Sequence, residues 1–453
     1  MQTGAVSVPP GLAAARQQMA VSLGWHIVLA CFGVALPAMI WVMHRRGVRR
    51  NDSAALVLAQ RWSRVAAVLF AIGAVSGTVL SFEMGLLWPG LMSRFGDVLG
   101  LPFAIEGIAF FVEAIFLAIY LYGWNRLPSA VHRATLLPVM AAGVAGSYCV
   151  VSVNAWMNAP TGFTMLADGS VTKVRPFQVL FNSVALLHFL HMWIGAFMLV
   201  GFLVASIYAA GMLRGRADAH HRLGFLVPFA FASIAAVAQP FVGHITGARL
   251  ATEQPSKLAA MELNQHATSR APLLIGGVLV NGQVRWGIEI PVLGSLAATN
   301  SLNGVVPGLD DIAEPPRANV VHLAFQTMVG LGSALAGFAV LFWIMRRRRP
   351  DVLANRWFLR AAVLAGPAAV VALEAGWITT EVGRQPWIVY GVQRVTDAAS
   401  RSSGLWVSYA VVLALYLAMT AIAVRVLLSM SRRWRNGAPA NLPTPYGPEQ
   451  AEQ

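Results

Sequence analysis

Residues 20–43 read AVSLGWHIVLACFGVALPAMIWVM, and His44, Arg45 and Arg46 follow at once. The run carries no Asp, Glu, Lys or Arg, and it is longer than the roughly 20 residues that a helix needs to cross a bilayer. Basic residues after an apolar run are the reverse of a cleavable signal peptide, in which they come first. We therefore expect this run to remain as a membrane-spanning helix.

Further apolar runs of similar length follow along the chain. Together with the first they predict nine spans: 20–43, 63–84, 101–123, 134–155, 179–209, 223–243, 318–345, 359–383 and 405–430. The composition agrees, because 57% of the 453 residues are hydrophobic and only 11% are charged, against roughly a quarter in soluble proteins. The sequence predicts an all-α polytopic membrane protein.

The net charge of +14 comes from arginine clusters between the apolar runs. These clusters are Arg45, Arg46, Arg49, Arg50, Arg61 and Arg64; Arg126 and Arg133; Arg214, Arg216 and Arg222; residues 346–349; and Arg432, Arg433 and Arg435. All of them fall on one side, which the positive-inside rule assigns to the cytoplasm. We expect the amino terminus outside and the carboxyl terminus inside, and no nucleic acid partner, since the charge is topological.

The chain is expected to have five parts. They are an outer amino-terminal segment (1–19), helices one to six (20–243), an outer loop (244–317), helices seven to nine (318–430) and a cytoplasmic polar tail (431–453). The loop is rich in Gly, Pro, Asn and Thr and contains strand-like pieces such as 282–286. A connection of that length is usually functional or a linker. No internal repeat or inverted symmetry is found, which weakens a transporter interpretation.

Cys31 and Cys149 lie inside apolar runs without CxxC spacing, which excludes a disulfide framework and a thiolate metal site built from this chain alone. Metal would have to be held by His, Met or carboxylate. Ionisable residues inside a bilayer are costly and default to functional hypotheses. Here they are His26, Glu83, Glu106, Glu113, His188, His191, Glu374 and Glu381.

His191 and Met328 are expected at similar depth in spans five and seven, where they could clamp one planar ligand. His and Met are the axial pair of many low-spin haems. A lone Met in an apolar helix is otherwise a gap-filling residue. His26 also belongs to the outer half, so a second redox layer is possible there, whereas Glu83 at a span end is expected to be a packing residue.

Glu374, Trp377, Glu381 and Arg384 are spaced to share one helical face. They could supply a carboxylate ligand, an aromatic wall and a guanidinium for a haem propionate. An ion-paired helix cap is the alternative.

Glu106 and Glu113 lie two turns apart on one face of span three. That spacing suits a proton relay. The alternative is a pair of carboxyls that neighbouring helices satisfy.

Residues 376–387 read GWITTEVGRQPW, which resembles the GWxxxExGRQPW signature of cytochrome bd-type quinol oxidases, subunit I. Further matching motifs occur in the same order: SLGWH (22–26), GAVSGT (73–78), AIEG (104–107), FFVE (110–113), VNAWM (153–157), HFLH (188–191), QPSKLAAME (254–262) and FQTM (325–328). The resemblance covers residues 20–430.

The resemblance implies haem cofactors and their ligands. His191 and Met328 would hold a low-spin haem b of the b558 type. His26 and Glu381 would ligate two high-spin haems, one a haem b of the b595 type and the other a haem d or a third haem b, in an order left open. Arg384 would hold propionates.

The resemblance also assigns roles in the reaction. Lys257, one of only two lysines, and Glu262 would bind or deprotonate quinol. Glu106 and Glu113 would deliver protons or line the high-spin haem pocket.

Three departures from the family pattern stand out. The outer loop is short after Glu262, as in the class that includes cyanide-insensitive oxidases. Gln326 replaces an arginine near the low-spin haem, which puts its potential in doubt. His188 stands where other members have lysine, and it would tune the site rather than ligate.

The chain is therefore expected to be the haem-bearing subunit of a bacterial inner-membrane oxidase that oxidises quinol, with ubiquinol expected, at the outer face and reduces dioxygen to water. Protons released outside and taken from inside would separate charge without a pump. A second membrane subunit and a small single-span accessory subunit are the expected partners. The rivals are a membrane haem protein that transfers electrons from quinol without an oxygen site and, more distantly, a proton-coupled transporter.

Overall fold

The computed structural model describes residues 8–348 and 351–437. Residues 1–7 of the expected outer segment, Arg349 and residues 438–453 of the expected tail lie outside the described residues. The long helices are α1 (Leu12–Arg50), α2 (Ser53–Leu87), α3 (Pro89–Tyr122), α5 (Leu136–Asn158), α7 (Ala185–Leu213), α8 (Ala219–Glu253), α11 (Ala318–Arg348), α12 (Arg356–Gly383) and α14 (Leu405–Arg435).

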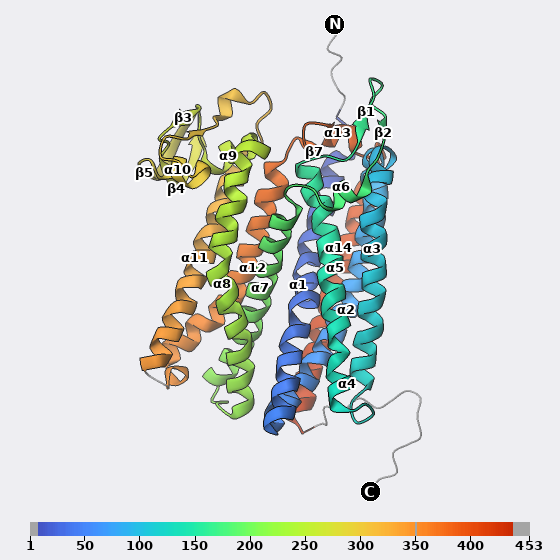
Figure 1. Cartoon of the computed structure of the whole chain (residues 1–453), viewed down its shortest axis with the longest axis vertical. Coiled ribbons are helices and arrows are strands. Elements are labelled where there is room, and N and C mark those ends of the chain that lie inside the picture. Colours follow the sequence, from blue (N-terminus) through green and yellow to red (C-terminus); the bar gives the residue numbers. More distant parts are fainter. Residues whose placement is uncertain (1–7, 349–350, 438–453) are drawn as a thin grey trace.

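Short elements fill the connections (Figure 1). The short helices are α4 (Ser129–Ala134), α6 (Pro176–Leu180), α9 (Pro255–Glu262), α10 (Leu293–Thr299), α13 (Val395–Ala398) and the 3-10 turns Leu309–Asp311 and Val352–Ala354. The strands are β1 (Thr164–Met165), β2 (Val171–Thr172), β3 (Thr268–Ser269), β4 (Leu273–Val280), β5 (Gln283–Ile290), β6 (Val305–Val306), β7 (Trp387–Val389) and β8 (Gln393–Arg394). They form two-stranded antiparallel pairs β1–β2, β3–β6, β4–β5 and β7–β8.

Nine helices in the described part of the chain are long and apolar enough to cross a membrane, which confirms the predicted number. Several are longer than the apolar runs that predicted them. Helix α1 begins at Leu12 rather than at residue 20, and α8 continues to Glu253. The extra turns mix apolar residues with charged and polar ones, such as Arg16 in α1 and Arg249 in α8, so hydropathy marks the apolar core of a helix rather than its ends.

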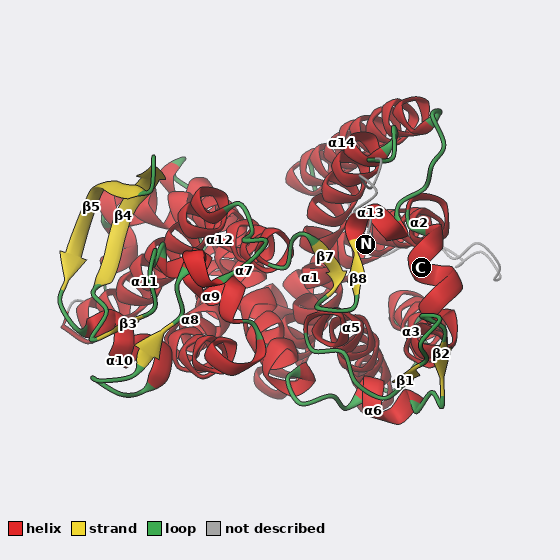
Figure 2. Cartoon of the chain, turned by 90° about the horizontal axis from the view of Figure 1, so that it is seen from above, coloured by secondary structure: helices red, strands yellow, loops and turns green. Residues whose placement is uncertain are grey.

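The long helices form two groups of four, seen end-on in Figure 2. The first group is α1, α2, α3 and α5, and the second is α7, α8, α11 and α12. Helix α7 also packs against α1 and α5 and so joins the two groups, while α14 packs on the outside against α1 and α2. The second group is held by stacked and edge-to-face rings of Phe225, Phe229, Phe342 and Phe358.

Helix starts at the arginine-rich end of the bundle are capped by side chains. Asp52 accepts a hydrogen bond from the Ala55 amide and pairs with Arg46 at 2.8 Å. Asp218 caps α8, and Asn355 caps α12. Each cap satisfies amides that the first turn of a helix leaves free.

Residues 244–317 lie at the opposite end of the bundle and are mostly structured (Figure 1). The strand predicted around 282–286 is confirmed as part of β5. Asn281 and Gly282 both have positive φ, at 50° and 75°, which is the backbone of a tight two-residue hairpin turn. The hairpin gives the loop a fixed shape.

The β4–β5 hairpin is fastened to α11 by three side chains on one helix face. Asn319 exchanges two hydrogen bonds with the backbone of Leu279, at 2.7 and 2.9 Å. His322 contacts the carbonyl of Gly276, and Gln326 donates to the carbonyl of Leu274 at 2.9 Å. Gln326, the residue that departs from the family pattern, thus serves to dock the loop.

Candidate functional site

His191 and Met328 lie on two helices of the second group that are separated by α8 and α12. His191 lies on α7 and Met328 on α11, and each of these helices packs against both α8 and α12. The two helices are therefore diagonal neighbours, and the His191 ring lies against α8 while Sδ of Met328 lies against α12. This arrangement suits a planar group held from both faces.

Glycines on the lateral helices make room beside both candidate ligands. A Cβ at Gly243 of α8 would lie 3.3 Å from Cε1 of His191, and one at Gly376 of α12 would lie 2.8 Å from Sδ of Met328. Gln239 also approaches His191, with its Nε2 at 3.2 Å from either ring nitrogen. Oε1 of Gln239 is buried and accepts no hydrogen bond from residues 8–348 or 351–437.

Glu381 sits at the end of α12 with both carboxylate oxygens occupied. Oε1 accepts from Nδ2 of Asn154 at 2.6 Å, and Oε2 accepts from Nη2 of Arg384 at 2.7 Å. Arg384 is only 4% exposed. Part of this geometry is that of an ion-paired helix end, which is the alternative interpretation of the helical face that carries Glu381 and Arg384.

Arg384 nevertheless has unused hydrogen-bonding capacity. Its Nε and Nη1 are buried and have no hydrogen-bond partner among the described residues, and the same holds for Nε1 of Trp377 and Oε1 of Glu374. Buried polar groups are normally satisfied, so a set of unpaired ones spaced along the end of α12 suits a bound polar group. A guanidinium with two free N–H groups fits the carboxylates of a haem.

His26 lies inside the first helix group, between α1 and α2, whereas Glu374 lies where α12 of the second group meets α1. His26 on α1 has its Nδ1 at 2.7 Å from Oγ of Ser76, which fixes the ring orientation. A Cβ at Gly77 would lie 3.2 Å from Cε1 of His26, and one at Gly24 would lie 3.2 Å from Oε2 of Glu374. Small residues again leave space beside candidate ligands.

Glu106 and Glu113 on α3 face the interior of the first helix group. Cγ of Glu106 lies 3.9 Å from the position of a Cβ at Gly146 on α5, and Oε1 of Glu113 lies 3.3 Å from one at Gly33 on α1. Neither carboxyl has a side-chain hydrogen bond among the described residues. Both carboxyls are therefore free to interact with water or a bound group.

Lys257 and Glu262 belong to α9 at the loop end. Lys257 is 3% exposed, and its Nζ donates to Oδ1 of Asn158 at 2.8 Å. Burial first, and the nearby charge of Arg384 second, lower the pKa of Lys257 to about 7, although Glu381 acts in the opposite direction. Burial raises the pKa of Glu262 to about 7, and its Oε2 has no hydrogen-bond partner in the part of the chain that the structure describes. Both groups can exchange protons near neutral pH.

Lys257 and Glu262 do not contact each other through a hydrogen bond in this structure. Five residues along a helix turn the side chain by roughly 140°, so they leave α9 in different directions. The stem of Lys257 packs on the end of α12, where a Cβ at Gly383 would lie 2.7 Å from its Cγ. Lys257 thus joins the loop to the helix that carries Glu381.

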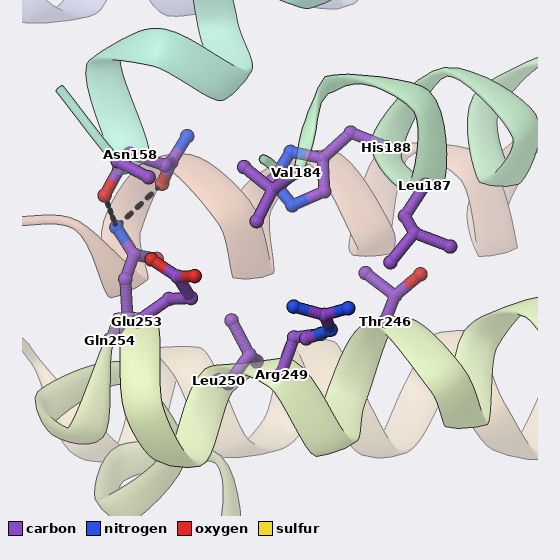
Figure 3. A pocket seen from close by; sticks show the side chains of 10 residues that line it. Asn158, Val184, Leu187, His188, Thr246, Arg249, Leu250, Glu253 and Gln254 are labelled. Carbon is purple, nitrogen blue, oxygen red and sulfur yellow. Dashed lines mark hydrogen bonds between the residues drawn. The ribbon is translucent and has the colours of Figure 1, made fainter. Parts of the chain in front are cut away.

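A narrow pocket opens beside Asn158, between α5, α7 and α8 (Figure 3). Its polar lining comes from Asn158, His188, Arg249, Glu253 and Gln254. A second recess of about 270 Å³ adjoins it and shares Asn158 and Glu253. His188, predicted to tune the site, therefore lies on the wall of a pocket that leads toward Asn158.

The residues that sequence reasoning missed are mostly neutral amides. Asn154 stands in a quoted motif, but no role was expected for it, and Asn158 and Gln239 were not singled out. The signal was the spacing of Asn154 and Asn158, which puts two amides on one face at the end of a span.

Glu83 packs as expected, since its Oε1 accepts from Gln18 and Ser22 at 2.9 and 2.8 Å.

Comparisons with known proteins agree with one another. Residues 14–434 match the family described as cytochrome bd terminal oxidase subunit I. The chain is 33% identical to the Bacillus subtilis (strain 168) protein named "Putative cytochrome bd menaquinol oxidase subunit I", over 93% of this chain and 97% of that one. It is 27% identical to the cytochrome bd ubiquinol oxidase subunit 1 of the same organism, over 86% of each chain.

A solved structure is also similar. A chain of the bd oxidase from Geobacillus thermodenitrificans aligns with a TM-score of 0.89 and 35% identity, over 95% of this chain and 100% of that one. The arrangement of helices described above is therefore found in a protein of measured structure.

Proposed function

Since this chain belongs to the cytochrome bd terminal oxidase subunit I family, we propose that it oxidises quinol at the loop end of the membrane and reduces dioxygen to water. The observation that carries the proposal is the placement of Lys257. A buried lysine with a pKa of about 7 lies in the loop and packs against the end of α12 that bears Glu381 and Arg384. A proton-exchanging group of the loop is thus next to candidate haem ligands.

Three sets of residues would hold the haems. His191 and Met328 would bind the low-spin haem from its two faces, while His26 and Glu381 would ligate the high-spin haems, one of them a haem d or a third haem b. Arg384 would pair with propionates through its unpaired Nε and Nη1. Bound haem supplies one-electron transfer and the centre at which dioxygen is reduced.

The residues at the loop end would manage the protons of the quinol. Oxidation of each quinol to quinone releases two electrons and two protons, and four electrons with four protons convert dioxygen to two waters. Glu262 in its ionised form would accept a proton from a quinol hydroxyl, and Lys257 would hydrogen-bond a quinol oxygen. The recess of about 270 Å³ beside Asn158 and Glu253 supports entry of the head group at this end of the bundle.

Protons for water formation would come from the opposite end. Glu106 and Glu113 line the interior of the first helix group and step along α3 toward that end. If the arginine-rich end is cytoplasmic, as the positive-inside rule predicts, electrons and protons meet from opposite sides of the membrane. Charge is then separated without a pump.

The proposal includes a bacterial inner-membrane location, a second membrane subunit and a small accessory subunit. The relatives differ in their named quinol, one menaquinol and one ubiquinol. Ubiquinol is our proposal for this chain.

Two measurements on the purified complex test the function. Reduced-minus-oxidised spectra should reveal three haems, whereas an electron carrier without an oxygen site would have one. Lys257→Ala should lose quinol oxidation yet keep oxygen uptake from an artificial reductant that bypasses the quinol site. Lys173→Ala, which changes the exposed second lysine, is the matched control and should leave both activities intact.

A further inference from the structure

Lys257 and Glu381 are joined by a continuous chain of hydrogen bonds through two amides. Lys257 Nζ donates to Asn158 Oδ1 at 2.8 Å. Asn158 Nδ2 donates to the backbone oxygen of Asn154 at 2.7 Å and to its Oδ1 at 3.2 Å. Asn154 Nδ2 then donates to Glu381 Oε1 at 2.6 Å.

The two ends of the chain fix its direction. An ammonium can only donate and a carboxylate can only accept, so the amide of Asn158 must turn its oxygen to Lys257 and that of Asn154 its nitrogen to Glu381. All side-chain dipoles therefore point the same way, from the cation to the anion. Hydrogen bonds in such an oriented chain polarise one another, and the effect is stronger away from water.

The chain is shielded from solvent at the lysine end. Lys257 is 3% exposed and Asn158 is 2% exposed. Gln254, which is 1% exposed, donates to Oδ1 of Asn158 at 2.9 Å and to its backbone oxygen at 3.0 Å. Asn158 is thus held in place by a second donor whether or not Lys257 is present.

We propose that Asn158 is a positioning residue that couples the charge of Lys257 at the quinol site to Glu381 at the high-spin haem. This inference rests on the proposed function of those two residues. The ammonium draws electron density along the two amides, which makes the Glu381 carboxylate a weaker donor to iron. A change in charge at the quinol site would in this way change the potential of the haem that Glu381 ligates. This coupling would not depend on electron transfer through the low-spin haem.

A double-mutant cycle on the midpoint potential of the Glu381-ligated haem tests the proposal. Lys257→Met removes the ammonium, and we expect it to lower this potential at about pH 6, because a positive charge favours the reduced, more electron-rich form. Asn158→Asp keeps an oxygen for Lys257 but has no N–H for Asn154. In the Asn158→Asp background, Lys257→Met should therefore produce only a small part of the shift.

Two further variants complete the design. Asn154→Ala removes the hydrogen bond to Glu381 and leaves the contact between Lys257 and Asn158 intact. It replaces Asn158→Asp in the cycle if the Asn158→Asp enzyme does not retain its haems. Asn182→Asp is the matched control, because this buried amide donates only to the backbone oxygens of Ser152 and Val179. The full effect of Lys257→Met should persist in the Asn182→Asp background.

The outcomes are distinct. An equal shift in the wild-type and broken-chain backgrounds would mean that Lys257 acts through space, and would overturn the coupling. A Lys257→Met enzyme that loses quinol oxidation with an unchanged haem potential would also overturn it, while leaving the proposed function in place. A Lys257→Met enzyme that oxidises quinol normally would instead refute the proposed role of Lys257.

Discussion

Lys257→Met should make the protein more resistant to unfolding, even though it removes a residue of the proposed quinol site. Lys257 is 3% exposed, and its pKa falls from 10.5 to about 7. The methionine side chain has a similar length and needs no proton. Asn158 Oδ1 keeps the Gln254 donor at 2.9 Å, so the substitution does not leave that oxygen unpaired.

The magnitude follows from the shift in pKa. A change from 10.5 to about 7, at about 1.4 kcal/mol per unit, means that the charged form of Lys257 lowers the free energy of unfolding by roughly 5 kcal/mol. Because the folded-state pKa of this base is lowered, the unfolded state binds more protons between these two values. The destabilisation is complete below about pH 7 and fades as the pH rises toward 10.5.

Thermal unfolding of the detergent-solubilised complex, followed by tryptophan fluorescence at about pH 6 and about pH 9, measures this effect. The gain in stability of Lys257→Met over wild type should be largest at the lower pH and smaller by ~3 kcal/mol at the higher one. Lys173→Met, at an exposed position, should leave the stability unchanged at both pH values. A gain that does not vary with pH, or a loss of stability at the lower pH, would refute the reasoning.

The other predictions concern haem binding and proton transfer. His191→Ala and Met328→Leu should each abolish or shift the low-spin haem band, and unchanged spectra in both would exclude them as ligands. Glu113→Gln should assemble with all its haems and accept electrons from quinol but reduce oxygen slowly, so normal turnover would rule out an obligatory relay at this carboxyl. Since the pKa of Glu262 is raised to about 7, quinol oxidation should rise with pH through that value as the carboxylate forms, and Glu262→Gln should remove this rise; a pH profile that keeps it would assign the base elsewhere.

Most of the membrane architecture was predictable because hydropathy is a property of the chain itself. Each long apolar run corresponds to a helix, and the arginine clusters fall at one end of the bundle. The ends of the helices were not predictable in this way. The first turns of α1 combine apolar residues with Arg16, Gln17 and Gln18, and tertiary contacts stabilise them, as when Gln18 donates to Glu83 on α2.

The charged residues of the candidate site are the ones that composition alone singles out. Glu381 and Lys257 stand out in an apolar sequence because an ionisable group in that setting needs a reason. Asn158 has no charge, and its importance depends on groups from α9 and α5 that come together only in the fold. The diagonal relation of His191 and Met328 likewise depends on which helices pack together, which the sequence does not specify.

The attachment of the β4–β5 hairpin to α11 has a consequence for engineering. Asn319, His322 and Gln326 all bind backbone groups of β4, at Leu279, Gly276 and Leu274. These side chains of α11 therefore bind the backbone of the strand and not its side chains. Hairpins of different sequence but equal register could be grafted onto this helix, so the loop of residues 244–317 can diversify while the helices beneath it stay the same.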